Sequence, residues 1–319
     1  MAISKKKTIF SVIIMVGVML AIYAVSGGFK VFSNTPYDSF STDTTNFNKT
    51  YKIPPIVTFA GEKLPLDNFD TRESLERELL TSAYRHSSTI LIIKRANRYF
   101  PVIEKILKEN DIPDDFKYLA AAESEYSNMI SPAGATGFWQ IMKETGKEEG
   151  MEINEVVDER YDVEKSTQFA CEYFRKSYEK YGNWTLAAAS YNGGRAAIDE
   201  QIQIQKQTNY YDLLLSEETA RYIFRAVAYK LVISDPENYG FNIKADELYP
   251  PLKYYEVNVD TAITDFSGFA EKYGTNYKLL KFLNPWLRKP YLTPKTGKVY
   301  KIKIPADGMR NGESLENVN

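Results

Sequence analysis

Two adjacent prolines, Pro250-Pro251, divide this chain into parts whose apolar residues repeat with different periods. Before the prolines, apolar residues recur mainly at helical spacing. After them, residues 255–259 and 298–305 alternate in the manner of strands, and 266–273 and 277–283 are typical of short helices. The 319 residues provide enough length for two modest domains. The pattern therefore predicts a mainly α fold, with a helical domain followed by a small α+β module of order βααβ.

One acidic residue lies within the apolar face of a predicted helix. Residues 113–126 have helical spacing, and their apolar stripe consists of Phe116, Leu119, Ala122 and Tyr126. Glu123 falls inside this stripe, whereas Glu125 turns away from it. A carboxyl group on an apolar face loses hydration, which raises its pKa and makes it a candidate general acid. The helix alone equally allows a structural Glu123 that a neighbouring hydroxyl or amide satisfies.

A glycine-containing loop, residues 131–142, follows this helix. Its glycines permit a tight turn, Phe138 and Trp139 offer flat apolar surface, and the Gln140 amide can donate and accept hydrogen bonds. Aromatic surface beside an amide is suited to holding a sugar ring. The alternative is an ordinary glycine-rich loop that leads into the core.

A third block, residues 184–194, is an alanine-rich predicted helix that ends at Tyr191-Asn192 with glycines as its stop signal. At a helix end, these two polar side chains could either cap and pack or face a ligand. The block alone leaves both interpretations open.

In this order, the three blocks resemble the catalytic domain of the soluble-lytic-transglycosylase family, whose lysozyme-like members cut bacterial peptidoglycan. The sequence from Gly137 to Ile141 is most similar to the membrane-bound lytic murein transglycosylase D branch. One departure is Ser190, where the family usually has Ala before the Tyr-Asn pair. The matching positions are Ile112-Pro113, Tyr118-Leu119, Glu123-Ser124, Ser131, Ala133-Gly134-Ala135, Gly137, Trp139-Gln140 and Tyr191-Asn192.

The resemblance implies that Glu123 is the sole catalytic acid and base. It would protonate the β-1,4 bond between N-acetylmuramic acid and N-acetylglucosamine. It would then deprotonate the muramic acid 6-hydroxyl, which closes a 1,6-anhydro ring without consuming water. Substrate-assisted glycosidases are a known exception to the use of paired carboxylates.

The resemblance also assigns roles around Glu123. Gln140 and Met142 would line the cleft near the substrate acetamido group, and Ser131 would hydrogen-bond the Glu123 carboxylate. Tyr191 would lie close to Glu123 and help to place it. Asn192 would support the same corner, and Ser124 is carried over as a further substrate-binding position.

Two other functions stay open. A goose-type lysozyme-like hydrolase would need a second carboxylate, and the candidates near in sequence are Glu125, Glu144, Asp158 and Asp162. Glu144 and Asp158 are more typical of solvated charges or helix caps. A non-catalytic peptidoglycan-binding protein is the other alternative, and a soluble helical interaction protein is a weaker third.

Other chemistries have little support. The only histidine, His86, has no motif around it, and the only cysteine, Cys171, lies in an aromatic-rich helical run that favours a buried apolar role. A zinc site needs more such ligands than this chain has, and no phosphate-binding glycine motif is present. With 40 basic and 42 acidic residues, the net charge of −2 gives no support for nucleic-acid binding. We expect no metal and no organic cofactor.

The N-terminus predicts export. Three lysines at 5–7 precede a nearly unbroken apolar run at 9–25, which favours a membrane anchor, with a cleaved signal segment as the alternative. Either option places the catalytic domain in the periplasm of the cell envelope. The predicted division is an anchor or signal at 1–29, a flexible tether at 30–70, a helical lead-in at 71–109, the catalytic domain at 110–240, a module at 250–305 and a disordered tail at 306–319.

The C-terminal module is similar to a LysM domain, with Tyr273-Gly274 and Leu283-Asn284-Pro285 at their usual places. Such modules bind glycans that contain N-acetylglucosamine. The Gly-Asp pair that normally follows the first strand is replaced by Val259-Asp260. The module could therefore bind glycan strands or serve as a packing and spacing element. Further expectations are that Pro101 begins a helix, that Asp162 opens one, and that the lead-in packs against the catalytic domain.

Overall fold

The structure is a computed structural model that describes residues 49–310. The predicted anchor or signal segment, the tether up to residue 48 and the tail from residue 311 lie outside the described residues. Between residues 49 and 310, no helix combines the length and apolar character needed to cross a membrane.

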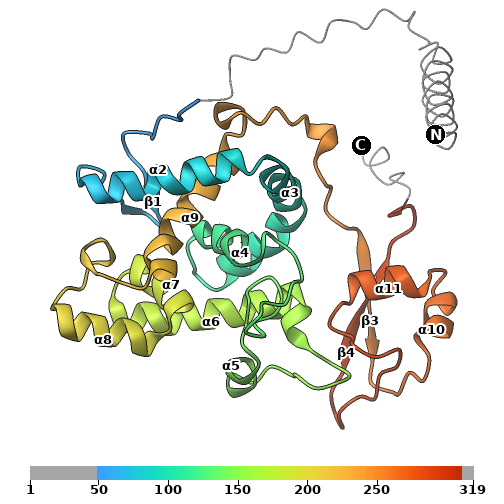
Figure 1. Ribbon diagram of the computed structural model, residues 1–319. Coiled ribbons are helices and arrows are strands. Elements are labelled where there is room, and N and C mark those ends of the chain that lie inside the picture. The colour runs from blue at the N-terminus through green and yellow to red at the C-terminus, as the bar shows by residue number, and fades with distance from the viewer. Residues whose placement is uncertain (1–48, 311–319) are drawn as a thin grey trace, which may run out of the picture. The chain divides into compact units, whose positions relative to one another are not determined.

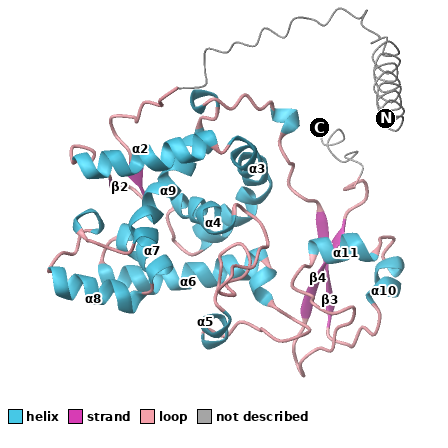
Figure 2. Cartoon of the chain, viewed as in Figure 1, coloured by secondary structure: helices cyan, strands magenta, loops and turns pink. Residues whose placement is uncertain are grey.

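The mainly α prediction is confirmed for the part of the chain before Pro250 (Figures 1 and 2). Its α-helices are α2 (Phe69–Tyr84), α3 (His86–Glu109), α4 (Lys117–Ser124), α5 (Lys143–Glu148), α6 (Val163–Tyr181), α7 (Trp184–Gly193), α8 (Arg195–Gln205) and α9 (Glu217–Ser234). Short 3-10 turns are η2 (Asp114–Phe116), η3 (Glu159–Tyr161), η4 (Tyr210–Asp212), η5 (Glu237–Tyr239) and η6 (Ala245–Glu247).

Side-chain caps explain where several of these helices begin. The Asp162 carboxylate accepts hydrogen bonds from the backbone N–H groups of Glu164 and Lys165 at the start of α6. Asn183 caps α7 and Ser216 caps α9 in the same way. The expectation that Asp162 opens a helix is therefore confirmed.

The predicted helix start at Pro101 is wrong, because Pro101 lies inside α3. Buried apolar residues on both sides of the proline share one face of this helix, among them Ile92, Ala96 and Ile103. Packing of that continuous face outweighs the local preference of proline for a first turn.

Residues 57–66 are packed into the helical domain, although the sequence predicted a flexible tether there. Strands β1 (Thr58–Phe59) and β2 (Glu62–Lys63) form an antiparallel hairpin, and Phe59 and Leu64 are fully buried. The Glu62 carboxylate accepts hydrogen bonds from the N–H groups of Trp184 and Thr185 at the start of α7, where a helix dipole favours negative charge. The hairpin therefore holds the beginning of α7 in place.

Helix α4 lies within the helical domain and is shorter than predicted (Figure 1). Leu119, Ala120 and Ala121 have no exposed surface. The helix ends at Ser124, because Glu125 and Tyr126 adopt left-handed backbone angles with φ of 53° and 52°. Tyr126 is thus not on the helical stripe, although its side chain is buried.

The βααβ prediction is confirmed after Pro251. Strand β3 (Tyr254–Val259), helices α10 (Phe266–Lys272) and α11 (Tyr277–Leu283) and strand β4 (Tyr300–Pro305) follow in that order (Figure 2). The strands are antiparallel, with Tyr254 opposite Pro305 and Val259 opposite Tyr300. Their core contains Ile302 and Ile304 but also Val157 and Tyr161, which belong to the preceding helical domain.

Candidate active site

Glu123 lies on the last turn of α4, and its half-buried side chain points toward α9. The Tyr222 hydroxyl donates a 2.6 Å hydrogen bond to Oε1 of Glu123. Burial raises the pKa of Glu123 to about 7, against the opposing effect of the Tyr222 hydrogen bond. The negative charge of Glu218 raises this pKa further, and the positive charge of Arg225 lowers it. Glu123 is therefore a carboxyl group that is poised to exchange a proton near neutral pH.

The neighbouring acid is held differently. Glu125 follows the end of α4 and accepts hydrogen bonds from Arg85 at 2.6 Å and from Ser88 at 2.8 Å. Glu125 thus forms an ion pair with α3 and its N-terminal flank, and only Glu123 is available for proton transfer at this helix end.

The loop 128–142 is bonded to the ends of both α4 and α7. The Ser124 hydroxyl donates to the Phe138 carbonyl at 2.8 Å, and the Tyr191 hydroxyl donates to the Trp139 carbonyl at 2.7 Å. Burial raises the pKa of Tyr191, and the negative charge of Glu123 raises it further. The loop, the end of α4 and the end of α7 therefore meet at one corner, as the motif order implied.

Gln140 lies at the turn of this loop, in a left-handed conformation with φ of 46°. Its Nε2 atom donates to the Gly137 carbonyl at 2.9 Å and to the Met129 carbonyl at 3.2 Å. Both bonds use the amide nitrogen, so the side-chain oxygen has no bond within the loop. Met142, at the end of the same loop, has 45% of its surface exposed, and Met129 at the start of the loop is equally exposed.

The aromatic pair of the loop does not form a platform for a sugar ring. Phe138 is 2% exposed and Trp139 is fully buried, with its Nε1 donating to Thr167 at 2.9 Å. The predicted sugar-stacking role is thus corrected in favour of the alternative, a loop that packs into the core. Ser124 is 1% exposed and its hydroxyl is bonded to backbone carbonyls, which corrects its assignment as a substrate contact.

Ser131 and Asn192 have bonds other than those expected from the sequence. The Ser131 hydroxyl accepts a hydrogen bond from the Ala135 N–H at 3.0 Å, within its own loop. The hydrogen bond to the Glu123 carboxylate comes from Tyr222 and not from Ser131. Asn192 accepts from Thr219 at 2.9 Å and donates to Glu218 at 3.3 Å. Asn192 therefore connects the end of α7 to the first turn of α9.

Sequence reasoning missed Tyr222 and Glu218. Both lie on α9, about a hundred positions after Glu123 along the chain, and neither belongs to a recognisable local motif. The available signal was indirect, because the apolar residues around Tyr222, such as Ile223, Ala226 and Val227, have helical spacing but mark no site. Its contact with Glu123 depends on how α4 and α9 pack.

Cys171 is buried, as the sequence predicted, and burial raises the pKa of its thiol to about 12. His86 is exposed at the start of α3. Across residues 49–310, no group of three or more His, Cys, Asp or Glu side chains is arranged to hold a metal ion.

Two protein families match parts of this chain. The chain matches the transglycosylase SLT domain family over residues 100–214 and the soluble lytic transglycosylase C-terminal LysM-like domain family over residues 255–308. It is 28% identical over 194 residues to membrane-bound lytic murein transglycosylase D of Escherichia coli K12, a match covering 58% of this chain and 42% of that protein. The same protein from Escherichia coli O6:H1 gives the same values.

The chain therefore spans less than half the length of these curated relatives. The 70 kDa soluble lytic transglycosylase of Escherichia coli aligns in structure with a TM-score of 0.36 and 19% identity, over 48% of this chain and 27% of that one. By its family matches, this chain contains a transglycosylase SLT domain at residues 100–214, followed by an SLT C-terminal LysM-like domain at residues 255–308.

Proposed function

We propose that this protein is a peptidoglycan lytic transglycosylase. It would cleave the β-1,4 bond between N-acetylmuramic acid and N-acetylglucosamine and leave 1,6-anhydromuramic ends. The observation that carries the proposal is Glu123, a half-buried carboxyl with a pKa of about 7 that receives a hydrogen bond from Tyr222 within an SLT domain. The proton of Glu123 is available at neutral pH, and the hydrogen bond from Tyr222 stabilises the carboxylate after the proton has left.

In this mechanism, Glu123 first protonates the glycosidic oxygen while the substrate's own acetamido group stabilises the positive charge at C1. The ionised Glu123 then takes the proton from the muramic acid 6-hydroxyl, which attacks C1. Intramolecular attack of this kind can gain about 7–11 kcal/mol from effective molarity, and proton transfer adds about 10²–10⁴-fold. We propose that Gln140 and the exposed Met142 contact the acetamido group, which the hydrogen-bonding capacity of the Gln140 side-chain oxygen and the exposure of Met142 support.

A hydrolase that releases reducing sugars is the second candidate, and Glu218 is the observation that favours it. Glu218 is an exposed carboxylate near enough to Glu123 to raise its pKa. Of the acids that the sequence suggested, Glu125 and Asp158 are in ion pairs, Asp162 caps α6 and Glu144 is exposed on α5. We assign Glu218 an electrostatic role, and its amide variant should still release anhydro products. Reducing products from the wild type that disappear in Glu218→Gln would support the hydrolase.

The pH dependence of cleavage should follow Glu123. The wild-type kcat/KM is expected to fall as the pH rises through about 7, because the acid must then lose its proton before reaction. Tyr222→Phe removes a bond that stabilises the carboxylate, so it should move this alkaline limb to higher pH. Glu218→Gln removes a negative charge, so it should move the limb to lower pH. Rates on soluble glycan fragments between pH 5 and pH 9 measure both shifts. If the alkaline limbs of the two variants shifted in the same direction, or did not shift, Glu123 would not be the group that transfers the proton.

We also propose that the protein acts in the cell envelope, with its domains in the periplasm and residues 1–29 as the membrane attachment. The apolar run at 9–25 and the match to a relative described as membrane-bound support this location. Membrane and soluble fractions of cells that express the chain with and without residues 1–29 test it. Recovery of both forms in the cytoplasm would contradict the proposal.

A further inference from the structure

The connection between α5 and α6 buries an unusual amount of charge. Its buried charged residues, each with 5–7% exposed surface, are Glu152, Asp158, Glu159, Arg160 and Asp162. A buried charge is costly unless it is paired and hydrogen-bonded, so the partners of these groups determine what the segment holds together. Asp162 and Glu159 have partners at the start of α6, and the other partners come from the LysM-like domain and from the active-site loop.

The LysM-like domain supplies the first set of partners. Glu152 accepts hydrogen bonds from Lys298 at 2.7 Å and from Tyr300 at 2.9 Å, and Lys298 also pairs with Glu159 at 3.0 Å. Backbone bonds continue the contact, because the Asp158 N–H donates to the Trp286 carbonyl at 2.9 Å. Val157 and Tyr161 complete it from within the apolar core of the LysM-like domain.

Arg160 supplies the contact with the active-site loop. Its Nη1 donates to the Ile141 carbonyl at 3.1 Å and to the Gly134 carbonyl at 3.2 Å, and so joins the two arms of the loop that carries Gln140. Asp158 fixes the guanidinium with bonds of 2.8 Å and 3.0 Å. The planar guanidinium can satisfy all of these acceptors together, which a lysine ammonium on a flexible stem cannot do in the same geometry.

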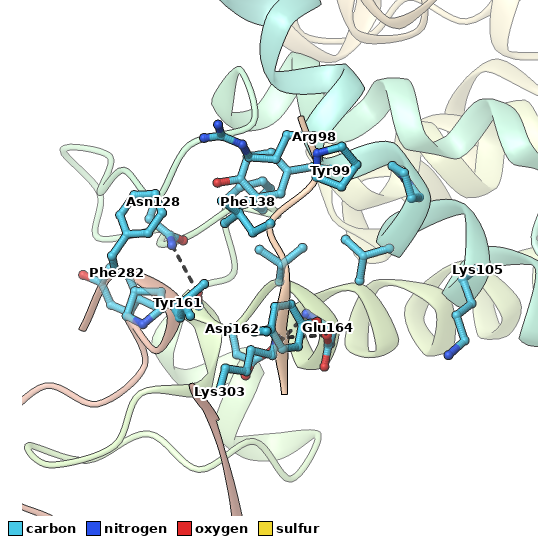
Figure 3. Close-up of a pocket in the computed structure, with 18 residues that line it drawn as sticks. Arg98, Tyr99, Lys105, Asn128, Phe138, Tyr161, Asp162, Glu164, Phe282 and Lys303 are labelled. Carbon is cyan, nitrogen blue, oxygen red and sulfur yellow. Dashed lines mark hydrogen bonds and ion pairs between the residues drawn. The ribbon is translucent and has the colours of Figure 1, made fainter. Parts of the chain in front are cut away.

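Little else on this side joins the loop to the LysM-like domain. A cavity of about 330 Å³ lies between them, lined by Tyr99 of α3, by Phe138 of the loop and by Phe282 and Lys303 of the LysM-like domain (Figure 3). Figure 3 also shows the bond by which Asn128 donates to the Tyr161 carbonyl at 3.2 Å. The loop is therefore fastened to the segment 152–162, and the segment is fastened to the LysM-like domain.

We propose that Arg160 is a positioning residue for the reaction, and that the LysM-like domain supports catalysis by holding the segment that carries Arg160. This inference rests on the proposed function for its kinetic consequence. The LysM-like domain would contribute through its packing against residues 152–161, whether or not it also binds a glycan strand.

Arg160→Lys is the direct test. The lysine keeps the positive charge beside Asp158 but cannot bridge Gly134 and Ile141, so the loop should lose its fixed geometry. We expect kcat/KM to fall about tenfold or more, mainly through KM, because misplacement of about 1 Å can cost as much as a hundredfold. The alkaline limb of the pH profile should stay in place, since the partners of Glu123 are unchanged. A general loss of folding would lower the amount of active enzyme without raising KM.

Two lysines of the LysM-like domain separate a specific role from a general one. Lys298→Met removes a partner of Glu152 and Glu159, which retain Tyr300 and Lys165. Lys301→Met is the matched control, because Lys301 pairs with Glu256 of β3 at 3.2 Å, within the LysM-like domain itself. We expect KM to rise about threefold in Lys298→Met and to stay unchanged in Lys301→Met. Combining Lys298→Met with Arg160→Lys should add no further loss, because both act through one contact.

Hydrogen exchange gives a readout that does not depend on activity. Amides of residues 134–141 should exchange about tenfold faster in Arg160→Lys and Lys298→Met, with no change in Lys301→Met. Unchanged exchange and unchanged KM in Arg160→Lys, or equal effects of the two lysine variants, would overturn the inference. If the wild type cleaved no peptidoglycan, the proposed function would be wrong. The exchange data would still show whether the LysM-like domain stabilises the loop through Arg160.

Discussion

Replacing Glu123 with Gln is expected to lower the rate of peptidoglycan cleavage at neutral pH by about 10²–10⁴-fold or more, because the amide can neither give nor take the transferred proton. The amide oxygen can still accept the hydrogen bond from Tyr222, so the local packing should persist. Release of soluble fragments from purified sacculi measures the effect. Glu125→Gln is the matched control, since that neighbouring acid is paired with Arg85 and should leave the rate unchanged.

Measuring the stability of Glu123→Gln distinguishes a loss of catalysis from a loss of folding. The pKa of Glu123 rises from 4.5 to about 7 on folding, so ionisation of this group opposes folding. The cost is absent below pH 4.5, grows as the pH rises, and reaches at most about 3 kcal/mol above pH 7. Glu123→Gln should therefore be more stable than the wild type to urea at pH 8 and equal to it at pH 4. Full cleavage activity in this variant would refute the assignment of Glu123.

Gly137→Ala is expected to produce the largest loss of stability in the active-site loop, of about 2–5 kcal/mol. A Cβ atom at this position would lie 2.0 Å from the Arg160 carbonyl oxygen, and the backbone has a left-handed φ of 83°. The left-handed conformation costs an alanine about 1–2 kcal/mol, and displacing packed backbone typically costs about 1–3 kcal/mol more. Urea unfolding of the purified variants measures the change.

Gly134→Ala is the control for Gly137→Ala within the same loop. Gly134 has a similar φ of 86°, but a Cβ atom there would meet nothing within 4 Å. It should therefore cost only the conformational part, about 1–2 kcal/mol. Equal losses in the two variants would mean that the close approach of Gly137 to Arg160 does not contribute to stability.

Those parts of the fold that depend on local sequence could be predicted. Asp162 was expected to open a helix and caps α6, because a carboxylate before an apolar run satisfies free backbone N–H groups wherever it occurs. The alternation around Val257 and Ile302 predicted the two strands that pair in the LysM-like domain. The position of Glu123 within an apolar stripe likewise anticipated the burial that raises its pKa.

Those parts that depend on packing between distant segments could not be predicted. Tyr222 reaches Glu123 only because α9 packs against α4, and no local pattern marks that contact. A tryptophan such as Trp139 is equally typical of a sugar-binding surface and of a protein core, and only its burial in the structure assigns it to the core. The hairpin around Phe59 follows a polar stretch at residues 41–46, whose composition suggested a tether, while the apolar side chains of the hairpin fill the helical domain.

The central claim is that one carboxyl, Glu123, cleaves the glycan and closes the anhydro ring. Mass analysis of the fragments that the purified protein releases from sacculi tests this claim most directly. The proposed mechanism predicts muropeptides with 1,6-anhydromuramic ends, which are lighter by one water than the hydrolysis products. Fragments that all carry reducing ends would contradict it.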